Sequence, residues 1–236
     1  MPVCSNCEDR GFKLMEVDGE EMWVPCDCRK KKDAQDILNY KLDEAGIPRH
    51  FVNYTLETYK ASEMSSIKKT FNKASLETLE NYINNPDLVF QTFRTLWIWG
   101  RDISSGHTTL AILLGISMIK HGYSVRYLEM AKLIEYFTKF EEKENFFTEL
   151  QNYQVYILND SFDRTRMDVK SDYTKIQLFQ FLNDGINNNK YFIMTSNVNV
   201  SEISNSNDTK YEQCRILLQR SIKTLEFQGT IKGSII

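Results

Sequence analysis

Short strand-like runs alternate with segments of helical length from residue 95 onward. The runs stand at Thr95–Trp99, Ser124–Leu128, Gln154–Leu158, Tyr191–Thr195 and Lys223–Phe227. The segments between them predict helices at Thr108–Lys120, Met130–Phe140, Asp172–Asn187 and Lys210–Ser221. Strands that alternate with helices form a parallel sheet with helices on both faces. The alternation therefore predicts an α/β fold, with a parallel sheet flanked by helices.

Four of the five cysteines lie near the start of the chain, as Cys4-x-x-Cys7 and Cys26-x-Cys28. Between the two pairs, Asp18-Gly19 separates two strand-prone runs, which is typical of a tight β-hairpin. Zn²⁺ prefers four thiolate ligands in a tetrahedron, and two close pairs joined by a hairpin can supply them with little strain. Such a site leaves no coordination position open, so we expect a structural zinc module. Reduced buried cysteines and redox-active cysteines are the alternatives.

The segment after the cysteines connects this module to the rest of the chain. The basic run Arg29–Lys32 would offset the negative charge of four thiolates on one dication. A helix is expected at Asp33–Ala45, with Gly46 as its C-terminal stop and Pro48 beyond it. A further helix is expected within Ser62–Ile83, where apolar residues recur at helical spacing.

Charge and hydropathy limit the binding partners and the cell compartment that we expect for the protein. The 236-residue chain has a formal net charge of -3, so any affinity for nucleic acid must come from a local basic patch. No apolar run is long enough for a membrane helix and no secretory signal is visible, which predicts a cytoplasmic protein without a membrane partner. Cysteines in that compartment stay reduced and are available for metal. The fifth, Cys214, is expected in the core.

A glycine-bounded turn joins the strand at Thr95–Trp99 to the following helix, as in a phosphate-binding loop. In such a loop, N–H groups at the helix start cradle phosphates, a lysine reaches the terminal phosphates and a Ser or Thr hydroxyl binds Mg²⁺. Gly106 and Thr108 fit, but His107 stands where the lysine belongs, and Gly100 is one residue too far away. A plain helix start capped by Ser104 or Ser105 is the alternative. The candidate phosphate-binding residues are Gly100, Ser105, Gly106, His107, Thr108 and Thr109.

Two later strands end in polar residues that a nucleotide site would use. Asn159 stands where a P-loop protein usually places the acid that holds Mg²⁺, so the affinity for the metal should be low. Asp160 could serve as the base or as a shifted metal ligand, and Asn197 could orient the water that attacks the γ-phosphate. Each of these residues also fits an ordinary turn at the end of a strand. Only the ordered set of motifs, and no single one of them, indicates a nucleotide site.

Taken in order, the motifs resemble those of bacterial helicase-loader ATPases of the DnaC and DnaI type, in the AAA+ superfamily and close to the transposition ATPase IstB. The resemblance is carried by Cys4–Gly11, Pro25–Cys28, Ala45–Phe51, Gly122–Tyr127, Asn159–Asp160 and Thr195–Asn197. It implies a P-loop AAA+ domain at residues 47–236 that senses nucleotide and DNA, and a zinc module at residues 1–46 that touches the helicase. Such a protein delivers a hexameric replicative helicase onto single-stranded DNA.

The resemblance also implies roles for individual residues. Gly106, His107 and Thr108 would form Walker A, Asn159 and Asp160 Walker B, and Asn197 sensor 1. The arginine finger, which reaches the γ-phosphate of a self-associated neighbour, would be Arg220 or Arg215, with Arg220 favoured. The arginine that the family usually has near the end of the chain is absent, and Lys232 is the nearest basic residue.

These departures remove charge from the nucleotide site. Neutralisation of the phosphates and the metal supplies most of phosphoryl-transfer catalysis. We therefore expect weak binding of ATP or ADP with Mg²⁺ and little or no hydrolysis. A loader could still act as a clamp or adaptor, because opening a helicase ring requires preferential binding to the open form. The loss of the motifs, with a residue usage rich in Asn, Lys and Ile, suggests a phage-encoded version.

Two other functions stay open at this point. A transposition ATPase of the IstB kind would share the fold but act with a transposase on double-stranded DNA, and the cysteine module argues against it. A non-enzymatic zinc adaptor of the replication machinery would keep the P-loop only as a relic. A small-molecule kinase has less support, because no lid-like basic cluster accompanies the loop. Contact with DNA rests on the resemblance alone, since the sequence has no basic–aromatic stripe.

Overall fold

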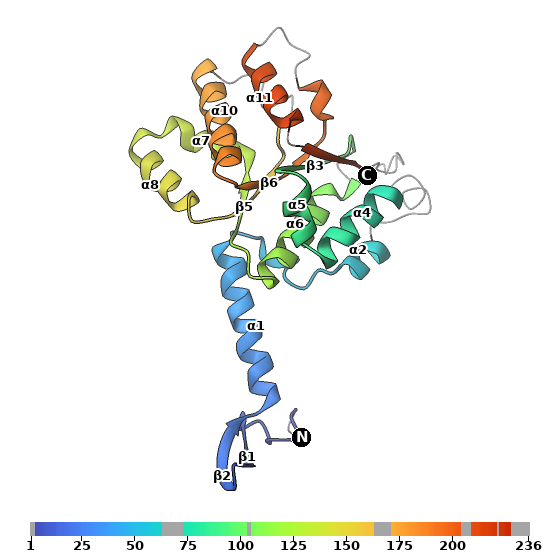
Figure 1. Ribbon diagram of the computed structural model, residues 1–236, viewed down its shortest axis with the longest axis vertical. Coiled ribbons are helices and arrows are strands. Elements are labelled where there is room, and N and C mark those ends of the chain that lie inside the picture. Colours follow the sequence, from blue (N-terminus) through green and yellow to red (C-terminus); the bar gives the residue numbers. More distant parts are fainter. Residues whose placement is uncertain are drawn as a thin grey trace, which may run out of the picture.

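A five-stranded parallel sheet forms the centre of the larger part of the molecule (Figure 1). The computed structural model describes residues 3–62, 73–102, 105–162, 171–203, 209–220 and 222–227. The strands are β3 (Thr95–Trp99), β4 (Val125–Glu129), β5 (Val155–Asn159), β6 (Tyr191–Ser196) and β7 (Ile222–Glu226), in the spatial order β4-β5-β6-β3-β7. Every pairing is parallel, which confirms the predicted α/β fold. The carboxyl ends of all the strands therefore meet at one edge, where such sheets bind ligands.

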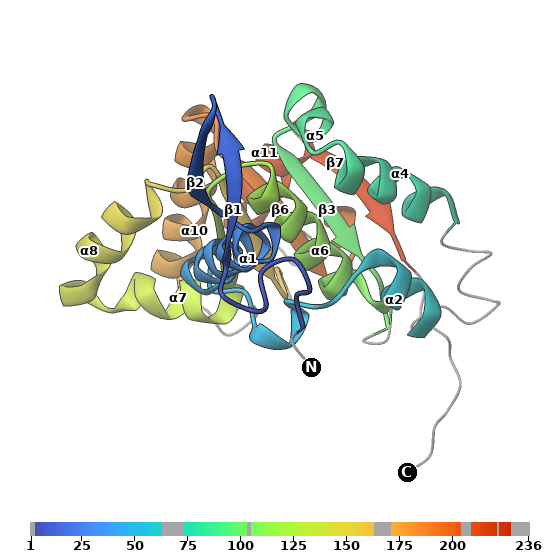
Figure 2. The same cartoon turned by 90° about the horizontal axis from the view of Figure 1, so that it is seen from below.

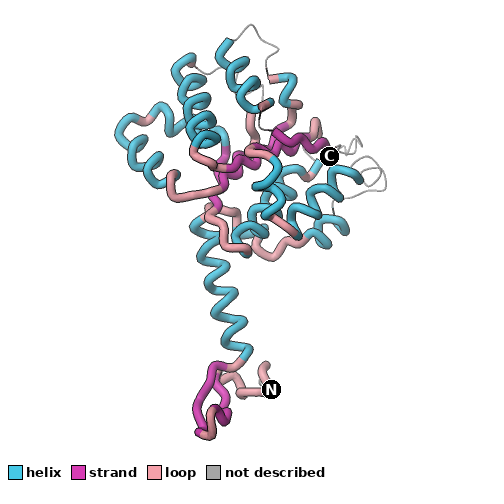
Figure 3. Tube along the Cα trace, viewed as in Figure 1, coloured by secondary structure: helices cyan, strands magenta, loops and turns pink. Residues whose placement is uncertain are grey.

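Helices cover both faces of the sheet, because successive strand residues point to opposite sides. In β3, Leu96 and Ile98 belong to one buried cluster, and Trp97 and Trp99 to the other. The first face is covered by α2 (Leu56–Ser62), α4 (Lys73–Asn84), α5 (Asp87–Thr92) and α6 (His107–Lys120). The second is covered by α7 (Met130–Thr138), α8 (Phe140–Leu150), α10 (Asp172–Asn187) and α11 (Thr209–Gln219). Figure 3 shows the strands between these two sets of helices.

The helix α6 lies closest to the sheet and carries the predicted phosphate-binding turn at its start. Its middle is buried almost all round, from Leu110 to Ile119. Gly115 allows the close approach, since a Cβ there would lie 2.3 Å from Cδ1 of Ile157 in β5. Among the described residues, no helix has both the length and the apolar character that a membrane crossing requires.

The N-terminal part consists of a hairpin and one long helix. The strands β1 (Phe12–Val17) and β2 (Glu20–Pro25) pair antiparallel around Asp18-Gly19, both of which have positive φ, as the hairpin signal predicts. The helix α1 (Asp27–Glu44) begins six residues before the predicted start at Asp33. The expected boundary was wrong because the basic run Arg29–Lys32 continues the helix: the carbonyl of Cys26 already accepts from the N–H of Lys30 at 3.0 Å.

The C-terminal end of α1 is anchored on the larger part of the molecule. Leu42, Ala45 and Ile47 are buried in the same cluster as α6. The N–H of Tyr127 in β4 donates to the carbonyl of Ala45 at 2.7 Å. Gly46 ends the helix with φ +73°, as predicted. From this anchor α1 extends outward and holds the hairpin far from the sheet (Figure 1).

Several further segments differ from the sequence prediction, among them α5 and most of α2, which were not predicted. The predicted helix at Ser62–Ile83 is described only as the end of α2 and as α4, because residues 63–72 lie outside the described ranges. The predicted helix at Met130–Phe140 ends at Thr138, and α8 follows as a separate helix that the periodicity missed. Two short 3₁₀ turns, η1 (Arg49–Phe51) and η3 (Val200–Glu202), were also not predicted. Ser221 and Lys232 lie outside the described residues.

Candidate functional site

The four N-terminal cysteines converge on one point at the outer end of α1. Cys4 and Cys7 come from the loop before β1, and Cys26 and Cys28 from the junction of β2 with α1. Their sulfur atoms all lie within 4.8 Å of one another. The Sγ atoms of Cys4 and Cys26 are 3.9 Å apart, and those of Cys7 and Cys28 are 3.3 Å apart. The structure thus brings together all four predicted metal ligands.

The spacing and ionisation of these thiols fit a divalent cation. Four sulfur atoms bound tetrahedrally at about 2.3 Å from a zinc ion are about 3.8 Å apart, close to the separations found here. A hydrogen bond from the backbone of Asn6 lowers the pKa of the Cys4 thiol to about 7, whereas the hydrogen bond with Cys7 raises the pKa of Cys28 to about 12. Crowded thiols resist joint ionisation, and a bound cation would stabilise them as thiolates.

Local contacts position the two cysteine pairs. The carboxylate of Asp9 accepts from the backbone N–H groups of Val3 at 3.1 Å and Cys4 at 2.9 Å. The guanidinium of Arg29 lies 4.4 Å from the ring centre of Phe12 in β1. Its Nε lies 3.7 Å from the carboxylate of Asp33. This member of the basic run therefore joins the hairpin to α1.

The predicted phosphate-binding turn packs against Tyr59 of α2. Gly106, at the start of α6, has φ +76°, and a Cβ there would lie 2.6 Å from the ring of Tyr59. The buried Tyr59 donates a hydrogen bond from its hydroxyl to the carbonyl of Ser105 at 3.3 Å. Both the backbone conformation and the close approach thus require glycine. Sequence reasoning found Gly106 but missed Tyr59, which stands 46 residues before Ser105 and belongs to no motif.

His107 does not supply the positive charge that a Walker A lysine brings to the phosphates. Its side chain is 6% exposed, and its Nδ1 forms a short hydrogen bond with Oγ of the buried Ser105. Burial lowers the pKa of His107 to about 4, so the imidazole is neutral at pH 7. A neutral, buried ring supplies no positive charge to phosphates. His107 and Ser105 therefore stabilise the base of the turn.

Asn159 connects three elements at the carboxyl edge of the sheet. Its Oδ1 accepts hydrogen bonds from Oγ1 of Thr108 at 2.9 Å and from Oγ1 of Thr195 at 2.7 Å. The N–H of Asp160 donates to Oγ1 of Thr195 at 3.1 Å. The start of α6, the end of β5 and the end of β6 are thus joined by neutral groups. An amide oxygen takes the position of a carboxylate but brings no charge for a cation, which favours weak Mg²⁺ binding.

Asp160 and Asn197 follow the adjacent strands β5 and β6, and both side chains are exposed. Asp160 has φ +53°, so the chain turns sharply directly after β5. Gly100 at the end of β3 donates from its N–H to the carbonyl of Ser196 at 3.1 Å. The structure therefore places the candidate catalytic side chains of β5 and β6 at the same edge as the turn that begins at Gly100. Thr109, in the first turn of α6, is half-buried.

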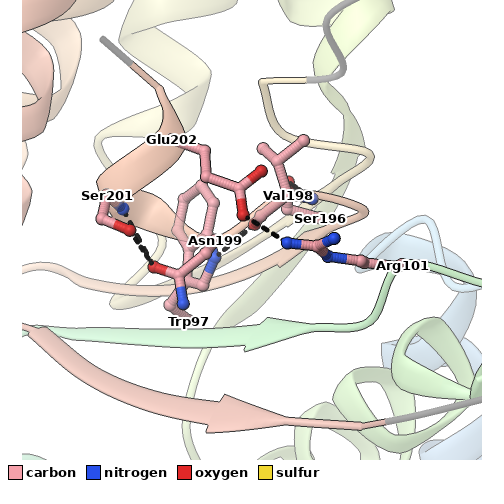
Figure 4. Close-up of polar contacts among 7 residues, drawn as sticks. All are labelled: Trp97, Arg101, Ser196, Val198, Asn199, Ser201 and Glu202. Carbon is pink, nitrogen blue, oxygen red and sulfur yellow. Dashed lines mark hydrogen bonds and ion pairs between the residues drawn. The ribbon is translucent and has the colours of Figure 1, made fainter. Parts of the chain in front are cut away.

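Figure 4 shows how the segment after β6 is tied to β3 and to the turn. The indole N–H of Trp97 donates to the carbonyl of Val198 at 3.1 Å. Beyond it, Nη2 of Arg101 donates to the carboxylate of Glu202 in η3 at 3.0 Å. Sequence reasoning missed Arg101, although a basic residue directly after Gly100 was a visible signal.

The two candidate arginine fingers have different surroundings. Arg215 on α11 donates to the carboxylate of Glu212 through Nε at 2.9 Å and to Oε1 of Gln219 through Nη1 at 2.8 Å. The side chain is thereby held along its own helix. Arg220 directly follows α11, is exposed, and has no ion pair with another described residue. The role of Arg220 as the arginine finger stays a prediction.

Comparisons with known proteins place this geometry in a family and a fold. The family described as IstB-like ATP binding protein matches residues 98–224, more than half of the chain. No curated protein matches the sequence. The chain is similar in structure to DnaI, with 14% identity, a TM-score of 0.59, and coverage of 78% of this chain and 93% of that one.

Two further solved structures share the fold. The DnaC helicase loader has 17% identity and a TM-score of 0.56, with 76% of this chain and 99% of that one covered. The replication initiator DnaA bound to AMPPCP and single-stranded DNA has 18% identity and a TM-score of 0.54, with 74% and 49% covered. The chain therefore spans about half of the length of the DnaA structures. At these identities the likeness shows a common P-loop AAA+ fold.

Proposed function

The chain belongs to the family of IstB-like ATP binding proteins, and from this membership we propose that it is a helicase loader of DNA replication. It binds a hexameric replicative helicase and assists its loading onto single-stranded DNA. The fold shared with DnaI and with the DnaC helicase loader supports the proposal. The feature that carries it is the exposed apolar surface of the N-terminal hairpin.

That surface is the face of the hairpin on which Leu14 lies opposite Trp23, and nothing in the described chain covers this pair. The next pair, Met15 and Met22, is exposed on the opposite face. Trp23 is 62% exposed and Leu14 48% exposed. Exposed aromatic and aliphatic side chains side by side are typical of the anchors of protein interfaces. The 18-residue α1, about 27 Å long, presents them away from the AAA+ domain (Figure 1).

We further propose that the ion held by Cys4, Cys7, Cys26 and Cys28 is Zn²⁺. A two-stranded hairpin cannot hold itself together in water, and a structural ion would supply the missing folding energy. Residues 1–46 then form the helicase-binding module and residues 47–236 the AAA+ domain. The last turn of α1 packs on that domain, so the module is held in one orientation.

The nucleotide site is proposed to bind ATP or ADP with Mg²⁺ weakly and to hydrolyse little or none. Gly100, Gly106, Thr108, Thr109 and Asn159 would line it, and the buried Ser105 and His107 would support the turn from below. Asp160, Asn197 and Arg220 would face the γ-phosphate, with Arg220 acting across a contact between two copies. The neutral side chains of His107 and Asn159 support low affinity, because two charges that P-loop proteins use are missing together.

Each alternative function has an observation in its favour. The burial of His107 favours a non-enzymatic zinc adaptor that also binds a replication protein but gains nothing from ATP. The family match favours a transposition ATPase of the IstB kind. A cysteine module on a projecting helix suits a protein-binding role in either case.

The test is binding of the full-length protein to the cognate replicative helicase, measured by biolayer interferometry with wild type and Trp23→Ala. Loss of an interface anchor costs about 2 kcal/mol, which is about a 30-fold increase in Kd. Tyr40→Ala is the matched control, because Tyr40 is 69% exposed on α1, outside the hairpin. Absence of helicase binding by the wild type would overturn the loader and adaptor proposals. Stimulated helicase loading only with ATP would exclude the adaptor.

A further inference from the structure

A groove runs between the outer part of α1 and the C-terminal end of α6. It has a volume of about 510 Å³. The two helices touch near the anchor of α1 and diverge from there toward the hairpin (Figures 1 and 2). On the α1 side, the residues Lys31, Ala34, Leu38 and Lys41 lie one above another on a single helix face. The same face continues inward to the buried Leu42 and Ala45, which makes the groove an uncovered extension of the core contact.

The floor of the groove is aliphatic. Ala34, Leu38 and Ile119 form it, with Ile37 at its side. Ile37 is 59% exposed, and Leu38 packs against the core only in part. An exposed strip of this kind on a helix face is suited to the apolar side of a second helix.

The rim of the groove carries positive charge that the described chain does not neutralise. Lys31, Lys41 and Lys120 line it, and no acidic residue does. None of the three lysines has an ion pair or hydrogen bond with another described side chain, although Lys30 and Arg29 of the same helix pair with Asp27 and Asp33.

Two acidic residues of α1, Asp36 and Asp43, lie on the side that faces away from the groove, by the rotation of 100° per residue. Asp43 is already paired with Arg49 at 3.1 Å. Asp27 lies on the groove face at the start of α1, but it is paired with Lys30 at 3.9 Å and does not line the groove. The lysines beside the apolar floor therefore leave the groove with a net positive charge.

We propose that this groove binds an acidic amphipathic helix of a partner protein. Lys31 and Lys41 are ten positions apart on α1, about 15 Å along the helix axis, which is room for about three turns of a bound helix. Apolar side chains of that helix would pack on Ala34, Leu38 and Ile119, and carboxylates on its flanks would pair with the lysines. Single-stranded nucleic acid suits the groove less well, because its lining has no aromatic ring and no arginine on which bases could stack.

The inference does not depend on the proposed helicase contact or on nucleotide. The groove lies along the face of α1 that carries Lys31, Leu38 and Lys41, whereas Leu14 and Trp23 lie on the hairpin beyond the start of α1. The two surfaces can therefore be tested separately, and failure of one leaves the other in place.

The experiment measures fluorescence anisotropy of a labelled synthetic peptide with full-length, metal-loaded protein. The peptide is helical, with leucines on one face and glutamates on both flanks, and a second peptide carries glutamines in place of the glutamates. Lys31→Glu and Lys41→Glu are compared with Lys32→Glu. Lys32 is the next residue on α1 but does not line the groove, so the control changes the net charge equally.

The wild type is expected to bind the acidic peptide at least about tenfold more tightly than the glutamine peptide. Each groove variant should weaken binding about tenfold, and Lys32→Glu should leave it within about twofold. Equal loss in all three variants would show a non-specific charge effect and overturn the site. Binding of labelled oligo-dT that is lost in the groove variants, without peptide binding, would overturn the choice of ligand in favour of nucleic acid.

Discussion

The cysteine cluster and the phosphate-binding turn both match known sequence motifs, but their structures have opposite character. In the cluster, all four ligand atoms lie within 4.8 Å of one another. In the turn, the residue at the lysine position is buried and the residue at the metal position accepts hydrogen bonds from two threonines. One motif is complete and its partner would be an ion, whereas the other has lost its charges and is stabilised by the protein's own side chains.

The difference shows what each site contributes to the molecule. A hairpin with exposed residues along both strands has little core of its own, so an ion held by the four cysteines would stabilise it and each ligand would matter. The AAA+ domain has a large core of its own. His107 belongs to that fold through its hydrogen bond with Ser105. Asn159 belongs to it through hydrogen bonds with Thr108 and Thr195. These two positions therefore contribute to the structure of the domain through contacts that involve no nucleotide.

The largest effect is expected from removing two metal ligands at once. Cys26→Ser with Cys28→Ser should reduce bound metal from about one ion per chain to nearly none, because two hydroxyls replace two thiolates. Metal analysis by plasma mass spectrometry measures it directly, and the helicase-binding assay should lose its signal in parallel. Cys214→Ala, which alters a buried cysteine of α11, should leave the metal content unchanged. Unchanged metal in the double variant would contradict the assignment of the site.

The second effect is a loss of stability in acid caused by His107. Burial lowers its pKa from 6.5 in the unfolded chain to about 4 in the folded protein. The folded state therefore resists protonation, so its full contribution is present above pH 6.5 and is lost as the pH falls toward 4. The difference corresponds to up to about 3 kcal/mol. Urea unfolding of wild type and His107→Gln between these pH values measures it.

In this titration, His107→Gln should flatten the pH dependence of the free energy of unfolding relative to the wild type. An unchanged slope in His107→Gln would show that the ring is not held neutral by burial.

The third effect restores charge to the nucleotide site. His107→Lys with Asn159→Asp should raise the affinity for ATP with Mg²⁺ by about 10- to 100-fold, since hydrogen bonds to charged groups contribute about 1.5–3 kcal/mol. Isothermal titration calorimetry with and without Mg²⁺ measures the change. Each single variant is the control and should gain less, because each supplies only one of the two missing charges. A wild type that already binds tightly would contradict the proposed loss.

The sequence predicted best where the signal was local. The strand at Thr95–Trp99 and the helix at Asp172–Asn187 agree with the structure to the residue, because apolar pattern and end signals coincide there. The four cysteines could be assigned to one metal site because the two members of each pair lie within three positions of each other in the sequence. By contrast, the start of α1 was misplaced, since a charged run such as Arg29–Lys32 is compatible with both helix and loop.

The nucleotide site was predicted in outline but not in its contacts. Gly106, Asn159 and Asn197 stand at the predicted ends of their elements. Whether His107 faces a ligand or the core depends on its burial and on its hydrogen bond with Ser105, neither of which the motif reveals. Tyr59 could not be predicted, because nothing near it in the sequence indicates that its ring fills the space beside Gly106.

The smallest effect is expected from removing the ion pair between Arg101 in the turn and Glu202. Arg101 and Glu202 join the turn to η3, but the arginine side chain is 74% exposed, so solvent screens the pair. Arg101→Ala should lower the free energy of unfolding by less than about 1 kcal/mol and leave the affinity of the His107→Lys, Asn159→Asp protein for ATP within about twofold. Arg49→Ala, which breaks the exposed pair with Asp43, is the control. A loss well above that of the control would mean that the turn depends on its remaining ion pair. The turn would then resemble the cysteine cluster in depending on charged groups.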